Sequence, residues 1–324
     1  MGADVLYDNF TSISLEIMRL GEIPGFDLYI PGANGPVLYR EHQVRFNREN
    51  LRSLLEKNVK FLYFTNDDQD LYYSYVENHL NDIVKDSNIA VSKKAAVLYD
   101  TSAYLARQML ALAAPGELAQ RASALMDTII AFTSDGDTSY KDIIEIMPRD
   151  YYTHSHCANV ATYSLALGRE VGLTLDTGLK ELTLGALLHD VGKSRVPLEI
   201  LNKTTALTRE EMDIIRKHVD WGMETIRAAS AISYKSYPAI AQHHERIDGS
   251  GYPAGLSDLH LFGRIVGAAD AFDAMTTNRP YKIAMTSFSA VSLLKSMEKQ
   301  YDRVVVRALV EVMAESRRRV SCLT

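Results

Sequence analysis

Histidines and carboxylates that could bind metal ions are concentrated in one part of this chain. Six of its nine histidines fall between residues 154 and 244: His154, His156, His189, His218, His243 and His244. His189 is followed directly by Asp190, and Asp270 lies within an apolar run. Imidazole nitrogen and carboxylate oxygen are both ligands for first-row metals, and the two oxygens of Asp190 allow it to bridge two ions. Because the histidines cluster, we predict a metal site here. Taken alone, the His-Asp pair would also fit a helix end with a surface ion pair.

Helices must position these side chains, because strand patterns fade after residue 116. The remaining apolar periodicity predicts an all-helical domain over residues 116–324, in which side chains from facing helices project into a common interior. His154 and His156 are two residues apart, so they point to nearly opposite sides of a helix and only one of them should face the site.

Residues 1–70 predict a small mixed α/β domain. Short β-type runs at 26–30, 37–39 and 59–64 are separated by turn-forming residues, and Asn47 is a good cap for a short helix. We find no chemical motif in this region, which favours a regulatory or packing module. The fold class expected for the whole chain is therefore α+β, with the mixed domain preceding an all-α bundle.

Residues 71–115 predict a helical connector with a weak break near 86–88. Val91, Leu98, Leu105 and Leu112 recur every seven residues, which resembles a coiled-coil stripe of about three heptads. The stripe is equally consistent with a dimerising helix and with a helix packed on its own domain.

Composition and charge narrow the class of protein. The net charge is −6, from 35 basic and 41 acidic residues, which argues against a general DNA-binding or membrane-surface protein. The only cysteines, Cys157 and Cys322, suggest no disulfide framework. No apolar run approaches the length of a membrane span and no leader is visible, so we expect a cytoplasmic protein.

The motifs of the second half, in their order and spacing, resemble the HD-GYP family of bacterial cyclic-dinucleotide phosphodiesterases. The resemblance covers roughly residues 135–315. It is carried by His156 with Asn159-Val160, His189-Asp190-Val-Gly-Lys193, His218, His243-His244-Glu245 with Asp248-Gly-Ser-Gly-Tyr252-Pro253, Asp270-Ala-Phe-Asp273, and Asn278-Arg279-Pro-Tyr-Lys282.

This resemblance implies a cofactor of two divalent metal ions, with iron or manganese favoured. His156, His189, Asp190 and Asp270 would hold the first ion. Asp190 would bridge to the second, which His218, His243 and His244 would also hold. Some members of the family bind a third metal through a glutamate one helical turn before the first histidine. Here that position is Tyr152, a poorer ligand near neutral pH, so we expect two metals.

Two metals about 3.5–4 Å apart can activate a bridging hydroxide for attack on phosphorus. Asp190 would then be catalytic, and Lys193 would bind a phosphate oxygen beside it. The resemblance supports Arg279 and Lys282 as further substrate-binding residues and Tyr252 as a substrate contact, the alternatives being exposed salt bridges and a structural turn. Asp273 could orient a ligand or be a surface acid, and Glu245 is similarly open.

The expected function is hydrolysis of cyclic di-GMP to linear pGpG, with GMP as a further product left open. GGDEF-domain proteins are expected partners through the Gly-Tyr-Pro loop, and a homodimer is a second possible assembly. Three alternatives stay open: a catalytically weak effector that binds cyclic dinucleotides, a phosphohydrolase of another nucleotide such as cyclic GMP-AMP, and a di-iron oxygenase.

Overall fold

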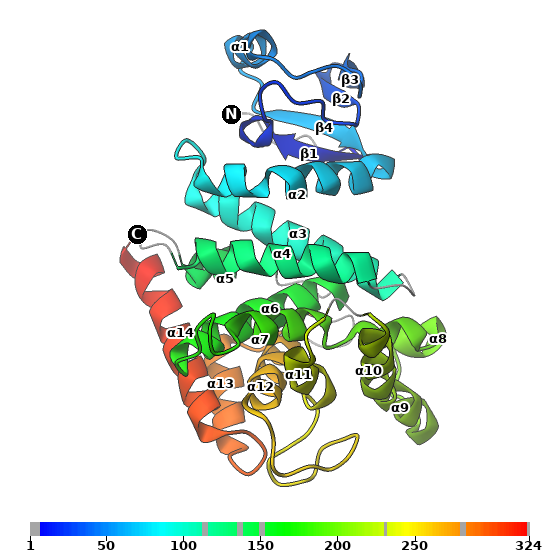
Figure 1. Cartoon of the computed structure of the whole chain (residues 1–324), viewed down its shortest axis with the longest axis vertical. Helices are drawn as coiled ribbons and strands as arrows, with labels where there is room; N and C mark the ends of the chain where they lie inside the picture. The colour runs from blue at the N-terminus through cyan, green and yellow to red at the C-terminus, as the bar shows by residue number, and fades with distance from the viewer. Residues whose placement is uncertain are drawn as a thin grey trace. The chain divides into compact units, whose positions relative to one another are not determined.

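The computed structural model describes residues 7–111, 116–134, 139–148, 153–229, 232–278 and 283–322 (Figure 1). It divides into two compact units, residues 1–97 and residues 98–324. A small antiparallel sheet in the first unit precedes a helical second unit, so the predicted α+β class is confirmed. Within these residues, no helix combines the length and apolarity that a membrane span requires.

The first unit is built on a four-stranded antiparallel sheet in the order β1-β4-β2-β3. Its strands and helices are β1 (Phe10–Ser14), β2 (Leu28–Gly32), β3 (Gly35–Arg40), α1 (Arg48–Glu56), β4 (Phe61–Thr65) and α2 (Gln69–Lys85), with short 3-10 helices η1 (Leu15–Ile17) and η2 (Asn66–Asp68). Aromatic side chains join α2 to the sheet, and the Phe64 ring stacks on Tyr72 with centroids 4.5 Å apart.

Local signals account for much of this unit. Asn47 accepts a hydrogen bond from the backbone N–H of Asn50 at the start of α1, as the capping prediction required. The predicted break near 86–88 separates α2 from α3 (Val91–Ala111). Strand β1 was not predicted. It forms by pairing with β4, from Phe10 opposite Thr65 to Ser14 opposite Phe61, which is a partner about fifty residues away.

Part of the connector stripe is buried within the single chain, although Val91 is half-buried and Leu112 lies outside the described residues. Leu98, Leu105 and Met109 of α3 are buried, so they do not form an exposed seam for a second copy. This burial favours the packed-helix alternative for residues 98–111, and dimerisation stays a prediction.

The second unit is all helical in the part of the chain that the structure describes. After α3 come α4 (Gly116–Phe132), α5 (Tyr140–Ile146), α6 (Thr153–Glu170), α7 (Leu179–Leu188), η3 (Val191–Arg195), α8 (Leu198–Leu201), α9 (Arg209–Arg216), α10 (His218–Ala228), η4 (Tyr234–Ser236), α11 (Tyr237–Ala241), α12 (Leu261–Thr276), α13 (Ser287–Ser296) and α14 (Arg303–Cys322). Helix α6 packs against α7, α12 and α14, and α11 packs against α7, α10 and α12. The predicted capping box at Thr208 and Glu211 is present, but its helix ends at Arg216, so His218 begins a new helix.

Candidate metal centre

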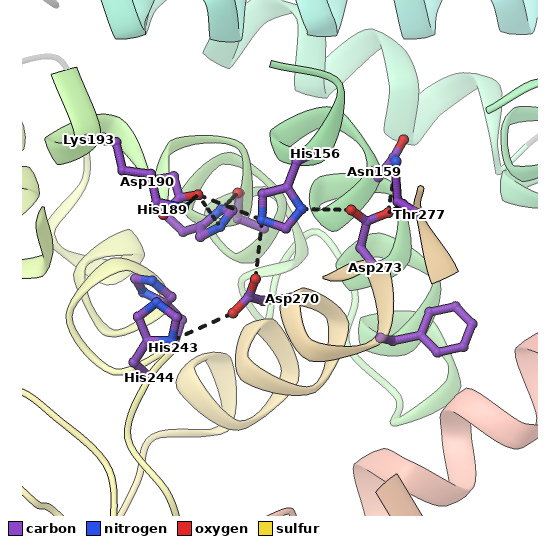
Figure 2. A network of polar contacts seen from close by, with 12 residues as sticks. His156, Asn159, His189, Asp190, Lys193, His243, His244, Asp270, Asp273 and Thr277 are labelled. Carbon is purple, nitrogen blue, oxygen red and sulfur yellow. Dashed lines mark hydrogen bonds and ion pairs between the residues drawn. The ribbon is translucent and has the colours of Figure 1, made fainter. Parts of the chain in front are cut away.

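Five segments bring the predicted ligands together in the interior of the second unit (Figure 2). His156 lies near the start of α6, and Asp270 lies in α12, which packs on it. The remaining side chains stand at helix ends: His189 and Asp190 after α7, His218 at the first position of α10, and His243 and His244 after α11. Helix ends suit this role because a side chain there can turn inward without disturbing a helical turn.

The seven side chains form two clusters. One contains Asp190, His218, His243 and His244, and the other contains His156, His189 and Asp270. Within each cluster the candidate ligand atoms lie within 4.8 Å of one another. All seven residues predicted as ligands are therefore found in one site.

Asp190 presents one oxygen to each cluster. Its Oδ2 lies 3.4 Å from Nε2 of His189 and 3.7 Å from Nε2 of His156. Its Oδ1 lies 3.4 Å from Nε2 of His218. This is the arrangement that a carboxylate needs to bridge two cations.

Asp270 also faces both clusters, which the sequence did not predict. Its Oδ1 lies 3.2 Å from Nε2 of His156, and its Oδ2 lies 3.7 Å from Nδ1 of His244. Asp270 is thus a second carboxylate that has one oxygen facing a ligand in each cluster.

Backbone carbonyls fix the orientation of three of the imidazoles. In each case Nδ1 lies 2.7 Å from the carbonyl oxygen three residues earlier: His189 with Ala186, His218 with Ile215 and His243 with Ile240. The last carbonyls of a helix lack partners within the helix, so a following histidine can donate to them. Since a carbonyl only accepts, Nδ1 carries the proton and Nε2 directs a lone pair into the site.

Unpaired buried atoms show that this donor set fits metal ions. Nε2 of His189 and Oδ1 of Asp190 are buried and have no hydrogen-bond partner among the described residues. Nε2 of His218 lies 3.2 Å from Nε2 of His243, although both atoms are acceptors in the tautomers just described. Such an arrangement is unfavourable by itself and is satisfied by cations that the nitrogen and oxygen atoms share.

The protonation states agree with a ligand role. Burial lowers the pKa of His218, and burial together with the neighbouring imidazoles lowers the pKa of His243 well below the ordinary value. Burial also lowers the pKa of His244 to about 3. Neutral imidazoles are the form that binds metals, so these histidines are ready to do so at neutral pH.

The carboxylates are held in their charged form. Burial alone would raise the pKa of Asp190, but the charge of Lys193 and the neighbouring imidazole of His189 outweigh it and hold that pKa well below the usual range. Nζ of Lys193 lies 2.5 Å from Oδ2 of Asp190, so this lysine is at the edge of the centre as predicted. For Asp270, the neighbouring imidazoles of His156 and His244 likewise outweigh the effect of burial and hold the pKa well below its usual range.

The Gly-Tyr-Pro loop lies beside the cluster that contains His244. The Tyr252 ring stacks on His244, with centroids 4.6 Å apart and an angle of 27° between the planes. The guanidinium of Arg216, a residue that sequence reasoning missed, lies 5.2 Å from the centre of the same ring. A Cβ on Gly251 would lie 2.5 Å from the His244 carbonyl oxygen, so this loop needs glycine there in order to approach the ligand segment.

Glu245 holds this loop in place. Its side chain is buried, and its two carboxylate oxygens accept hydrogen bonds from the backbone N–H groups of Ala254 at 2.7 Å and Leu256 at 2.9 Å. The role left open for Glu245 in the sequence is thereby defined as a contact between the ligand segment and the loop.

Asp273 is buried and its carboxylate lies 2.7 Å from Nδ1 of His156, so the surface-acid alternative is wrong. His154 belongs to neither cluster. Three residues of the predictions lie outside the described residues. They are Tyr152, on which the predicted number of metals rests, and Arg279 and Lys282, which were predicted to bind substrate.

A helical fold with two adjoining sets of histidine and carboxylate side chains defines a candidate metalloprotein. The family model described as "HD domain" matches residues 138–305, which is just over half of the chain. The chain therefore belongs to the HD domain family, which supports the HD-GYP resemblance of its motifs.

Named relatives are similar to part of the chain. The cyclic di-GMP phosphodiesterase PA4108 of Pseudomonas aeruginosa is 34% identical over 194 residues, which cover 59% of this chain and 47% of that protein. A cyclic di-GMP phosphodiesterase of Thermotoga maritima is 36% identical over 191 residues, covering 55% and 52%. The 3'3'-cGAMP-specific phosphodiesterase 1 of Vibrio cholerae is 35% identical over 149 residues, covering 45% and 34%. The chain thus spans about half the length of the first two of these relatives.

One solved structure resembles nearly the whole chain. It is Bd1817, an HDG"Y"P protein from Bdellovibrio bacteriovorus, with a TM-score of 0.67 and 21% sequence identity, covering 94% of this chain and 100% of the other. At this identity, the similarity supports the fold.

Proposed function

We propose that this protein is a metal-dependent phosphodiesterase that hydrolyses cyclic di-GMP to linear pGpG. The observation that carries the proposal is the position of Asp190 between the two ligand clusters, with one oxygen facing each. The names of the relatives from Pseudomonas aeruginosa and Thermotoga maritima supply the substrate. We assign the ligands as predicted, with two divalent ions and iron or manganese as the favoured metals.

Two bound metals would supply a nucleophile from water at neutral pH and neutralise charge on the phosphoryl oxygens. The chain's own residues hold and orient this centre. The imidazoles of His189, His218 and His243 are fixed by backbone carbonyls, so their Nε2 lone pairs need no rearrangement to bind. Lys193 places a positive charge at the edge of the centre, where a phosphate oxygen of the substrate would gain from it.

Tyr252 is the substrate contact that the geometry supports best among the described residues. Its ring lies against His244, so a dinucleotide whose phosphate reaches the centre would lie beside this ring. Arg279 and Lys282 remain proposed phosphate-binding residues on the basis of the motif alone.

Cyclic GMP-AMP is a second candidate substrate, because relatives from Vibrio cholerae are named for its hydrolysis. The groups assigned so far would bind metals and phosphate, which the two cyclic dinucleotides share. The choice between them depends on base recognition, so both must be assayed.

The first unit is proposed as a regulatory module, with cytoplasmic location and contact with GGDEF-domain proteins as further proposals. The charge of −6 argues against DNA as a partner. A protein that bound cyclic dinucleotides tightly without turnover would instead be an effector.

The test is a chromatographic assay of both cyclic dinucleotides, with protein purified anaerobically and loaded separately with iron and manganese. We expect metal-dependent appearance of pGpG from cyclic di-GMP. His156→Gln should lose bound metal and turnover, whereas His154→Gln, two residues away and outside both clusters, should keep them. Full metal occupancy without product from either dinucleotide would contradict the proposal, and tight binding in that case would indicate the effector.

A further inference from the structure

A line of hydrogen bonds links helix α3 to one of the candidate ligands (Figure 2 shows the part from Asn159 onward). The Tyr99 hydroxyl of α3 lies 2.7 Å from Oδ1 of Asn159 in α6. Nδ2 of Asn159 lies 2.8 Å from Oδ1 of Asp273 in α12, and Oδ2 of Asp273 lies 2.7 Å from Nδ1 of His156. All four side chains are buried, none more than 4% exposed.

Chemistry fixes the direction of every bond in this line. The Asp273 carboxylate accepts only, so Asn159 must turn its amide nitrogen toward it, and His156 must carry its proton on Nδ1. The amide oxygen of Asn159 then faces Tyr99, whose hydroxyl donates to it. Burial, with a smaller contribution from the charge of Asp273, raises the pKa of Tyr99, so this hydroxyl keeps its proton at neutral pH.

The consequence appears at the other end of the line. With its proton on Nδ1, His156 directs the Nε2 lone pair toward Asp190 and Asp270, at 3.7 Å and 3.2 Å. Without the Tyr99 hydroxyl, the amide oxygen of Asn159 would lose this partner, and the amide could rotate. A rotated amide would place its oxygen against the Asp273 carboxylate, which would then move away, and His156 would lose its fixed tautomer.

We propose that Tyr99 is a positioning residue of the metal centre, acting through Asn159 and Asp273 to hold His156 in the tautomer that binds metal. The inference rests on the ligand role of His156 in the proposed function. Tyr99 lies on the helix that begins in the first unit and continues into the second, so the same hydrogen bond ties this connector helix to a ligand.

Tyr99→Phe removes the hydroxyl and keeps the ring. Tyr104→Phe is the matched control, because Tyr104 is a buried tyrosine of the same helix whose hydroxyl accepts a hydrogen bond from Gln108. Manganese affinity of the full chain is measured by competition with a chelator, alongside the thermal midpoint. Removing a group that orients a metal ligand typically lowers metal affinity 10–100-fold. We expect about 10-fold for Tyr99→Phe, since it acts through two other side chains, and no change for Tyr104→Phe.

A second readout reports on His156 without metal. In metal-free protein with ¹⁵N-labelled histidine, the His156 signals are identified by their loss in His156→Gln. We expect one tautomer, protonated on Nδ1, in the wild-type protein and in Tyr104→Phe, and a mixture in Tyr99→Phe. A merely structural role would lower the thermal midpoint and leave this tautomer unchanged.

Wild-type manganese affinity and a single His156 tautomer in Tyr99→Phe would overturn the inference, as would equal losses in Tyr104→Phe. These outcomes are separate from the fate of the proposed function. If the wild-type protein binds manganese but hydrolyses no cyclic dinucleotide, the proposed function fails while the role of Tyr99 is still decided by affinity and tautomer.

Discussion

At the scale of single residues, the centre depends on which atom of each side chain points inward. Three histidines use the same device, donating from Nδ1 to a carbonyl three residues earlier, so that Nε2 is left for a ligand. The two oxygens of Asp190 lie close to Lys193 and to histidines of both clusters.

Asp190→Ala should therefore affect both clusters together. We expect metal affinity to fall by at least about 100-fold, the upper range for groups that only orient a ligand, and hydrolysis to be lost. Elemental analysis and the dinucleotide assay check this, with the exposed carboxylate Asp176 changed to Ala as a control. Full activity of Asp190→Ala at normal metal occupancy would sink the assignment of Asp190 as a bridge.

At the scale of elements, the loop that carries Tyr252 is fixed to the ligand segment from two directions. Gly251 lets the backbones approach, and Glu245 accepts two backbone hydrogen bonds from beyond the loop's proline. The two Glu245 hydrogen bonds that hold the loop go to backbone N–H groups, and neither involves a candidate ligand side chain.

Glu245→Gln should separate substrate binding from metal binding. The amide nitrogen of glutamine would face one backbone N–H donor, so one of the two hydrogen bonds is lost. Hydrogen bonds to charged groups contribute about 1.5–3 kcal/mol, and we expect KM for the dinucleotide to rise about 10-fold with metal content unchanged. Steady-state kinetics with elemental analysis measure this, with exposed Glu199→Gln as the control. A parallel loss of metal would show that Glu245 supports the ligands instead.

Another contact between elements depends on Gly192 in η3. A Cβ at this position would lie 1.9 Å from the His218 carbonyl oxygen and 2.5 Å from the backbone nitrogen of Gly222, both in α10. Two backbones cannot move apart as easily as a flexible side chain, so alanine here should displace His218 from the centre.

We expect Gly192→Ala to lower the free energy of unfolding by about 3 kcal/mol, at the upper end of the usual cost of overpacking. Gly116→Ala, at the start of α4, should have little effect, because the described residues place no atom within 4 Å of the added carbon apart from its chain neighbours and the backbone of its own helix. Urea unfolding of the two variants tests the difference, and equal stability of both would show that the η3–α10 contact relaxes at little cost.

At the scale of the whole molecule, all candidate ligand clusters among the described residues belong to the second unit. A ligand that binds only the folded state stabilises the unit that holds it, by about 2.7 kcal/mol at a free concentration 100 times Kd. Bound metal should therefore raise the free energy of unfolding of the second unit and leave that of the first unit unchanged.

Calorimetry with manganese and with chelator should show this selectivity. A domain of this size gains about 2–4 °C per kcal/mol, so we expect the midpoint of the second unit to rise by about 5–10 °C. The transition of the first unit should stay in place, and His156→Gln should reduce the shift. An equal shift of both transitions would contradict independent unfolding of the two units.

Much of this protein could be predicted from local signals. The clustering of histidines predicted a metal site, and the family resemblance of the motifs implied every member of the two clusters. Short-range capping at Asn47 and Thr208 marked helix starts, because these hydrogen bonds join residues three apart. The break after α2 was also predicted, from the local sequence near residues 86–88.

Contacts between distant residues were decided only by the tertiary structure. Strand β1 exists through its pairing with β4, and the second oxygen of Asp270 faces His244 only because α12 packs where it does. The line from Tyr99 to His156 joins residues from three helices, far apart in sequence. A sequence determines which groups can donate, accept or bind a metal, whereas the packing of helices determines which of them lie within hydrogen-bonding distance.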